Sequence, residues 1–322
     1  MKEIIVNNNQ AGQRLDKLLF KILDKAPKSF IYKMLRKKNI VLNGKKAEGS
    51  ELVACKDEIR LYLSDETINK FSAPTDIAIV NYDLDIIYED NNILLINKPV
   101  GVLSQRASKS DYSIAEYLIS YMLSTKQITK EELQSFKPAI CNRLDRNTSG
   151  LLIAGKTLIG LQEMARLLRE RSLDKYYLAI VKGKLAQDKE IIGYLTKDDE
   201  NNKVSISSEQ TINSDFIATA YRPLVYNEDF TLLEVKLITG KTHQIRAHLS
   251  SIGHPILGDS KYGDNRINNI FKKKYGLRTQ LLHSYRYVFP KLSGPLGNLS
   301  FKEFEAAEPE NFTNIRRDIF NK

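Results

Sequence analysis

The sequence has 322 residues, with 49 Lys or Arg against 39 Asp or Glu, so its formal net charge is +10. A surplus of this size favours a polyanionic partner, nucleic acid before membrane. No apolar run is long enough to span a bilayer and the first residues do not resemble a signal peptide, so we expect a cytoplasmic protein with no membrane partner. Cys55 and Cys141 lie far apart in the sequence, which argues against a disulfide framework.

The N-terminal residues predict two helices and a hairpin. Leucine and isoleucine recur at helical spacing over 14–26, and Pro27 ends that run. Ser29 is the expected cap of a second helix. A strand at 40–42 then leads into Asn43-Gly44, a favoured turn for a two-residue hairpin.

The same stretch is strongly basic. Between Arg14 and Leu63 there are thirteen Lys or Arg and only six Asp or Glu, so most of the surplus charge lies here. Charges on a helix often form only a solvated face, but these gather on the second helix and the hairpin instead of alternating with acids. The pattern resembles the S4 RNA-binding domain, a two-helix and hairpin module whose basic helix lies along folded RNA. The resemblance implies phosphate contacts from Lys33, Arg36, Lys37, Lys38 and Lys45.

We divide the chain into a small domain at 1–66, a linker at 67–85 and a larger domain at 86–322, and we expect 64–85 to be polar and irregular. The larger domain alternates strand and helix patterns, which predicts an α+β fold with a mixed, mainly antiparallel sheet flanked by helices. The strands are expected at 86–90, 93–99, 175–181, 218–221, 231–237 and 281–284. Residues 186–215 are polar and predict a solvent-facing excursion with weak strands.

Three helices are expected in this domain. One covers 113–125, and another follows Thr157 as its cap, with Leu158, Leu161, Ala165 and Leu168 turned inward. The third covers 243–252, with Thr242 as its cap and Gly253 at its end.

One loop concentrates chemically useful side chains. Asp145 stands between Arg143 and Arg146, ahead of an apolar run that predicts a buried strand. A carboxylate with cationic neighbours is expected to stay ionised, which suits nucleophilic or electrostatic work at a sugar carbon. The alternative is an aspartate that caps the turn and pairs with an arginine at the surface.

Other polar residues are less specific. All four histidines fall between 243 and 283, but His243 and His248 are five residues apart, whereas helical zinc pairs use a spacing of four, so we expect local hydrogen bonds and no metal site. Cys141 has no neighbouring base and is expected to be a small buried residue. Arg246 lies among apolar residues of its helix and, if it points inward, needs a partner such as Asp145.

Several stretches in fixed order resemble the signature blocks of the RluA family of pseudouridine synthases, and with the basic module in front they are most similar to the large-subunit rRNA pseudouridine synthase C (RluC) subgroup. These stretches are Asn142 through Leu152, Lys175 through Gly183, Thr239 through Gly263, Asn97-Lys98-Pro99 with Gly101, and Leu282-His283.

The resemblance implies isomerisation of uridine in RNA: the N1–C1′ bond breaks, the uracil turns, and a C5–C1′ bond forms. It implies no cofactor, and Asp145, Tyr177 and Arg246 as the catalytic residues. Asp145 would act at the ribose, Tyr177 would stack on the uracil and take the C5 proton, and Arg246 would pair with Asp145. Arg143, Lys175 and Leu282 would contact the substrate nucleotide.

One residue departs from the family pattern, since Asn142 stands where the family usually has His. We expect this change to alter local hydrogen bonding and not activity. The substrate expected from the resemblance is 23S ribosomal RNA, with tRNA or 16S rRNA as alternatives, and the protein is expected to be a monomer. Two rival functions are a non-catalytic S4-type RNA-binding protein that keeps the fold and a metal-dependent nuclease, which would need clustered carboxylates.

Overall fold

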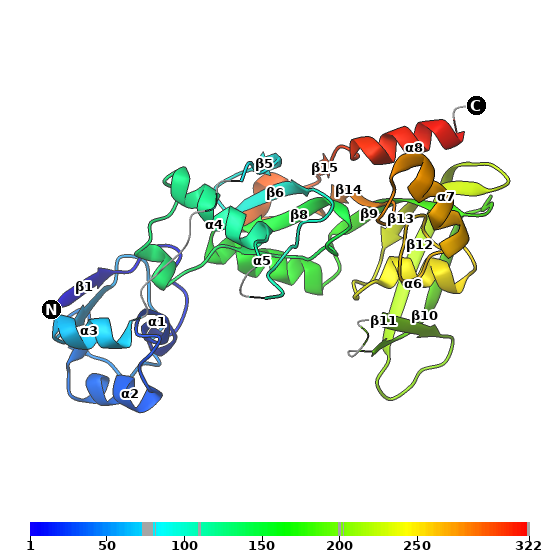
Figure 1. The fold of residues 1–322 in the computed structure, drawn as a ribbon. Helices are drawn as coiled ribbons and strands as arrows, with labels where there is room; N and C mark the ends of the chain where they lie inside the picture. The colour runs from blue at the N-terminus through cyan, green and yellow to red at the C-terminus, as the bar shows by residue number, and fades with distance from the viewer. Residues whose placement is uncertain (73–79, 81, 109–110, 199–200, 202, 321–322) are drawn as a thin grey trace.

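The computed structural model describes residues 1–322 except 73–79, 81, 109–110, 199–200, 202 and 321–322. An N-terminal module with a four-stranded sheet lies at one end of an elongated molecule, and an eleven-stranded sheet with its helices forms the rest (Figure 1). This arrangement confirms the predicted α+β class.

The N-terminal module contains the two helices and the hairpin predicted from the sequence. Its elements are β1 (Lys2–Ile5), α1 (Leu15–Ile22), α2 (Lys28–Arg36), β2 (Ile40–Leu42), β3 (Lys45–Lys46), β4 (Glu58–Leu61) and α3 (Asp65–Phe71). Asn43 and Gly44 have φ of 51° and 72°, the left-handed pair that a two-residue hairpin turn needs. The apolar faces of α1 and α2 share one core with β2 and β4.

Two local expectations for this module were wrong, and one of its strands was not predicted. Helix α2 begins directly after Pro27, so Ser29 lies inside the helix and does not cap it. Strand β1 was not predicted, because its four residues gain their order from antiparallel pairing with β4, far along the chain. Residues 64–85 are not irregular throughout: Ser64 Oγ accepts a hydrogen bond from the Thr67 amide at 3.2 Å and starts α3. Of the predicted linker, 73–79 and 81 lie outside the described residues.

The large sheet runs in the order β11-β10-β12-β13-β9-β14-β8-β6-β5, with β15 beside β14 and β7 beside β8. Its strands are β5 (Ile86–Glu89), β6 (Ile93–Lys98), β7 (Ala139–Ile140), β8 (Ser149–Gly155), β9 (Asp174–Lys182), β10 (Lys189–Asp198), β11 (Lys203–Ser207), β12 (Asp215–Tyr226), β13 (Phe230–Leu237), β14 (Leu282–Val288) and β15 (Glu303–Glu305). All pairs are antiparallel except β14 with β8, as expected of a mixed, mainly antiparallel sheet. Within the predicted weak excursion at 186–215, β10 and β11 are instead regular strands of the sheet, since β10 pairs with both β11 and β12.

The helices pack against the large sheet, and their buried side chains form two main apolar layers with it. They are α4 (Ile114–Ser124), η1 (Glu132–Gln134), α5 (Leu158–Arg169), α6 (Gln244–Ser251), α7 (Asn265–Tyr275), η2 (Gly294–Leu299) and α8 (Glu310–Phe320). The larger layer includes side chains of α4, α6, α7 and α8, and the smaller includes those of α5 and η2. No helix in the described part of the chain is long and apolar enough to cross a membrane.

Two helix predictions needed correction. Thr157 caps α5 as expected, and Leu158, Leu161 and Leu168 pack against the core clusters. Ala165 is exposed instead, and the buried residues of the helix are Gly160, Met164 and Leu167. Gly160 lies against the Asn92 carbonyl, where a Cβ would stand 2.2 Å from the oxygen, so this face has to turn toward the sheet. Helix α6 starts after His243, which has φ of 55°, and not from a Thr242 cap.

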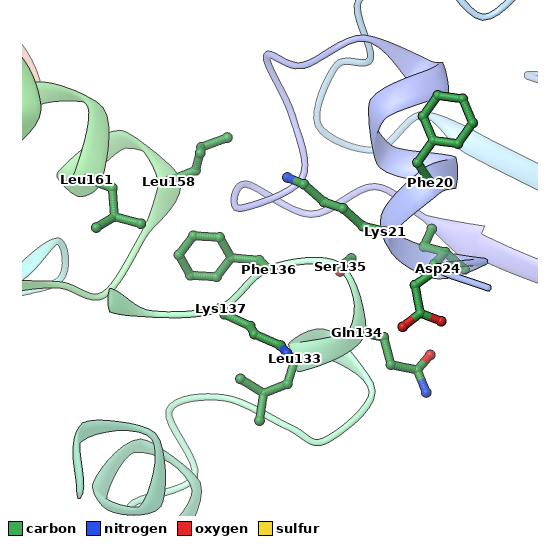
Figure 2. Close-up of a pocket in the computed structure, with 11 residues that line it drawn as sticks. Phe20, Lys21, Asp24, Leu133, Gln134, Ser135, Phe136, Lys137, Leu158 and Leu161 are labelled. Atoms are coloured by element: carbon green, nitrogen blue, oxygen red, sulfur yellow. The ribbon is translucent and has the colours of Figure 1, made fainter. Parts of the chain in front are cut away.

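The N-terminal module docks on the segment around η1 through polar contacts. Asn7 Nδ2 donates to Glu132 Oε1 at 2.9 Å, and the buried Gln10 Nε2 donates to Ser135 Oγ at 2.7 Å. Beside these contacts, α1, the η1 segment and α5 line an open pocket of about 550 Å³, with Phe20 and Phe136 among its lining residues (Figure 2).

Candidate active site

Asp145 lies on the loop between β7 and β8, and the backbone on both sides of it is held in place. Buried Ser104 Oγ donates to the Leu144 carbonyl at 2.8 Å and accepts from the Leu144 amide at 3.0 Å. The Thr148 amide donates to the Asp145 carbonyl at 3.0 Å. The loop is therefore ordered before any ligand binds, which is the preorganisation that a catalytic carboxylate needs.

Lys98 fastens the other side of the loop. Its side chain is fully buried, and Nζ donates to the carbonyls of Pro99, Val102 and Arg146 at 2.8, 2.8 and 3.0 Å. These three bonds use all the donors of an ammonium group. Burial lowers the pKa of Lys98 to about 7, although the charge of Asp145 acts to raise it.

Arg246 joins Asp145 to a second carboxylate. From α6, Nη1 donates to Asp145 Oδ2 at 2.8 Å, while Nε and Nη2 donate to Asp259 Oδ2 and Oδ1 at 2.7 and 2.9 Å. Burial lowers the pKa of Arg246, but the bonds and charges of Asp259 and Asp145 outweigh it and raise that pKa. The predicted contact of Arg246 with Asp145 is thus present, and Asp259 fixes the guanidinium from behind.

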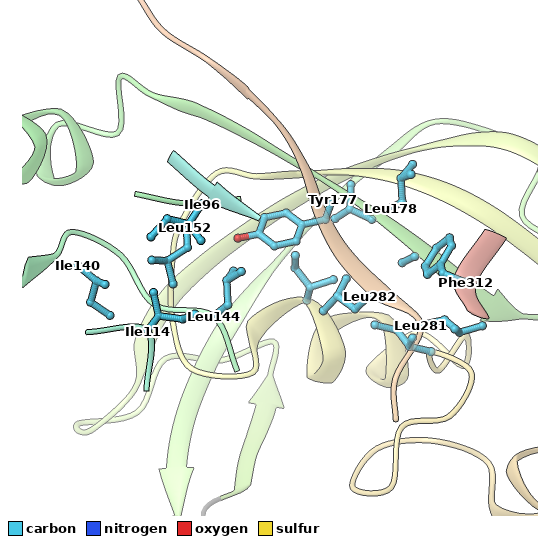
Figure 3. Close-up of a cluster of buried hydrophobic side chains, with 14 of the residues drawn as sticks. Ile96, Ile114, Ile140, Leu144, Leu152, Tyr177, Leu178, Leu281, Leu282 and Phe312 are labelled. Atoms are coloured by element: carbon cyan, nitrogen blue, oxygen red, sulfur yellow. The ribbon is translucent and has the colours of Figure 1, made fainter. Parts of the chain in front are cut away.

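Tyr177 reaches the same region from β9. Its ring is buried and lies among Ile96, Leu144, Leu152 and Leu282 (Figure 3). Burial, and next the neighbouring Tyr287, raise the pKa of Tyr177 well above its ordinary value, so the phenol stays neutral at neutral pH. Leu282, predicted to contact the substrate, lies in the same apolar cluster as Tyr177.

Asn142 contributes structural hydrogen bonds. Its Oδ1 accepts from the Ile153 amide at 2.9 Å, and its Nδ2 donates to Tyr287 Oη at 3.0 Å. Tyr287 Oη in turn donates to the Leu151 carbonyl at 2.7 Å. The residue that departs from the family pattern thus ties the Asp145 loop to β8 and β14.

The other predicted side chains lie farther from this cluster. Arg143 is exposed on the Asp145 loop. Lys175 is on β9, two residues before Tyr177 and so on the same side of the strand, and burial lowers its pKa. The basic residues of the N-terminal module are exposed at the end of α2 and on β3, away from α6 in Figure 1; they are Lys33, Arg36, Lys37, Lys38 and Lys45.

Sequence reasoning gave no role to Asp259, Tyr262, Ser104 or Lys98. Asp259 lies in a tight turn, where a Cβ at Gly263 would stand 2.1 Å from the Asp259 carbonyl oxygen. The sequence did contain a signal for this contact: an acid in a glycine-containing turn, thirteen residues after an arginine that could point inward. The structure shows why it is buried, since Arg246 supplies its countercharge.

The four histidines make hydrogen bonds, but their partners lie 19 or more residues away in the sequence, so the bonds are not local as expected. His248 Nδ1 lies 3.0 Å from Thr219 Oγ1, His254 Nδ1 lies 2.8 Å from the Lys182 carbonyl, and His283 bridges Ser149 Oγ and the Ala306 carbonyl. Within the described residues, no three His, Cys, Asp or Glu side chains gather as a metal ion would require. Burial raises the pKa of the Cys141 thiol to about 12, which disfavours the thiolate form.

The sequence and the structure are similar to those of known proteins. Residues 92–251 match the family model described as RNA pseudouridylate synthase. The chain is 36% identical over 235 residues to ribosomal large subunit pseudouridine synthase D of Borreliella burgdorferi, covering 72% of this chain and 67% of that protein. It is 30% identical over 315 residues to an uncharacterized RNA pseudouridine synthase of Mycoplasma genitalium, covering 94% and 95% of the two chains.

Two further comparisons extend the likeness. Ribosomal large subunit pseudouridine synthase C of Vibrio vulnificus is 29% identical over 297 residues, which cover 90% of each protein. The solved structure of human RNA pseudouridylate synthase domain containing 4 aligns with a TM-score of 0.55 and 24% identity, over 71% of this chain and 90% of that chain. At that identity the structural match bears on the fold alone.

Proposed function

Since the chain belongs to the RNA pseudouridylate synthase family and is an RNA pseudouridine synthase, an isomerase, we propose that its substrate is the RNA of the large ribosomal subunit. Relatives named for that subunit, the D enzyme of Borreliella burgdorferi and the C enzyme of Vibrio vulnificus, support this choice. The alternatives are tRNA and 16S rRNA. We further propose that the enzyme is a monomer and that it acts in the cytoplasm. Light scattering measures the oligomeric state directly.

The proposed chemistry centres on Asp145. The carboxylate acts at the ribose while the N1–C1′ bond breaks, the uracil turns within the site, and C5 bonds to C1′. The C5 proton is lost and N1 gains a proton, so atoms and charge balance without a cofactor. Arg246, held by Asp259, keeps the carboxylate aimed at the sugar. This arrangement of one arginine between two carboxylates is the observation that carries the assignment of Asp145.

Tyr177 is proposed to stack on the uracil and to accept the C5 proton. Its burial among apolar side chains supports the stacking role. Its raised pKa means that proton abstraction by a phenolate becomes faster with rising pH. The two roles can therefore be separated by experiment.

The target nucleotide has to leave its stack to reach Asp145, at a cost of a few kcal/mol. We propose that exposed Arg143 contacts or replaces the flipped nucleotide, and that Lys175 and Leu282 line its site. Leu282 lies beside Tyr177, which supports its place against the base (Figure 3).

We propose that the N-terminal module, extended to include α3, binds RNA as an S4-like domain. The exposed side chains of Lys33, Arg36, Lys37, Lys38 and Lys45 would contact phosphates. Such contacts add affinity that falls with salt and little sequence recognition. Their position at the opposite end of the molecule from α6 lets one RNA span both parts (Figure 1).

The test is tritium release from 23S rRNA labelled at uridine C5, with tRNA and 16S rRNA in parallel. Wild type and Asp229→Asn, an exposed acid in the β12–β13 turn, should release tritium from 23S rRNA, and Asp145→Asn should not. Release from tRNA or 16S rRNA alone would overturn the proposed substrate. Equal release by wild type and Asp145→Asn would overturn the role of the carboxylate.

A further inference from the structure

His243 occupies a strained position at the edge of the active site. It precedes α6 with φ of 55° and ψ of 14°, in the left-handed region that side chains other than glycine adopt at a cost of about 1–2 kcal/mol. Its side chain is only 8% exposed, and Nε2 lies 3.8 Å from Asp145 Oδ2. Strain of this kind is often retained where it aims a functional group.

The hydrogen bonds of Tyr262 determine which nitrogen of His243 carries the proton. Tyr262 Oη lies 3.0 Å from His243 Nδ1 and accepts a hydrogen bond from the Val204 amide at 2.9 Å. The phenol oxygen already accepts from the Val204 amide, and its single proton can be donated to Nδ1. We assign this direction to the bond, which leaves the imidazole N–H on Nε2.

The Nε2–H group faces Asp145 but is too far away to bond it directly. A separation of 3.8 Å exceeds hydrogen-bond range, and the same Oδ2 already accepts from Arg246 at 2.8 Å. Burial lowers the pKa of His243, although the charge of Asp145 acts to raise it, so the ring is neutral at pH 7. A neutral donor thus lies 3.8 Å from the carboxylate, within reach of a group bound there.

We propose that His243 Nε2 donates a hydrogen bond to the 2′-oxygen of the target ribose and so makes the site specific for a ribonucleotide. The inference rests on the proposed role of Asp145, which places C1′ at the carboxylate and the 2′-hydroxyl next to it. The ring oxygen is the other nearby acceptor, but a donor there would withdraw electron density from a sugar carbon that is losing its base. The 2′-hydroxyl is also the group that distinguishes RNA from DNA.

The chain offers a matched pair of variants. His243→Asn keeps an acceptor near the Nδ1 position for Tyr262 and suits a left-handed backbone, but it lacks the distal donor. His243→Gln places an amide N–H near the Nε2 position. Tyr262→Phe leaves the histidine in place and removes the group that fixes its tautomer.

The experiment compares short RNAs that carry either uridine or 2′-deoxyuridine at the mapped target, by dissociation constant and single-turnover rate. Wild type should lose about tenfold on the deoxy substrate, the scale of one hydrogen bond. His243→Asn should treat the two RNAs alike, His243→Gln should regain discrimination, and Tyr262→Phe should discriminate less than wild type. A purely structural role would lower both rates equally and leave their ratio unchanged.

An equal deoxy penalty in wild type and His243→Asn would overturn the inference. If His243→Asn does not fold, Tyr262→Phe provides the same comparison, and an unchanged ratio there would also overturn it. Nitrogen NMR of the free protein tests the tautomer directly, and a proton on Nδ1 would refute it. Absence of turnover by wild type on every RNA would refute the proposed function instead, while the NMR result would still decide the tautomer.

Discussion

Asp259→Asn is the substitution that tests the active site most sharply. The Asp259 side chain is fully buried, accepts two hydrogen bonds from Arg246, and also accepts from the amides of Lys261 and Tyr262. Asparagine has the same size and can keep the amide contacts. It lacks the negative charge, and its NH₂ group would face the guanidinium.

The expected loss of stability is about 3 kcal/mol. Removing one partner of a buried ion pair usually costs about 3–5 kcal/mol, because the other charge stays buried and unpaired. We expect the lower end, because Asp145 still pairs with Arg246. Since the guanidinium loses its support, the single-turnover rate should fall by up to about a hundredfold, as a misplacement of about 1 Å can cause.

Urea unfolding and tritium release from labelled rRNA measure the two effects on the same protein. Burial acts to raise the pKa of Asp259, but Arg246 outweighs it and the pKa is lowered. Its contribution to stability is therefore complete above the unfolded pKa of about 4 and disappears as pH falls through the folded value, so wild type and variant should converge in acid. Asp229→Asn is the exposed control. Unchanged stability and rate in Asp259→Asn would refute the reasoning.

Three further outcomes are expected. Tyr177→Phe should bind rRNA normally but not release tritium. Tritium release by wild type should rise between pH 7 and 9, because the raised pKa of Tyr177 makes the phenolate the minor form; a flat pH profile would leave Tyr177 only its stacking role. Ser104→Ala should lower the rate about tenfold without weakening RNA binding, because it frees the backbone of the catalytic loop; unchanged rates would contradict this. Replacing Lys33, Arg36 and Lys37 with Gln should weaken rRNA binding and lower its salt slope by about 0.7–0.9 per lost phosphate contact, as filter binding at several salt concentrations can show.

Local patterns predicted most of the elements but not their assembly. The hairpin at Asn43-Gly44 and the strands β5 and β6 followed from turn residues between apolar runs. The order of the large sheet did not, because β14 pairs with β8 and β9, which are more than a hundred residues away in sequence. Strand β1 was missed for the same reason.

The site was predicted in part. An arginine among apolar residues requires a countercharge, so the contact of Arg246 with Asp145 could be expected. Asp259 was missed, because the pattern that pointed to it, a carboxylate in a glycine-containing turn, also suits an exposed turn. The left-handed conformation of His243 was likewise hidden, because Thr242 beside it is a favourable cap by residue type and the actual helix start depends on tertiary contacts.

The position of β14 has a consequence for the protein during its own synthesis. This strand lies between β9 and β8 and joins the two halves of the sheet, yet it is formed by residues 282–288, near the C-terminal end of the chain. Until the ribosome has released those residues, β8 with the Asp145 loop and β9 with Tyr177 have no strand between them. The N-terminal module has a core of its own and can thus fold before β14 joins the two halves of the large sheet.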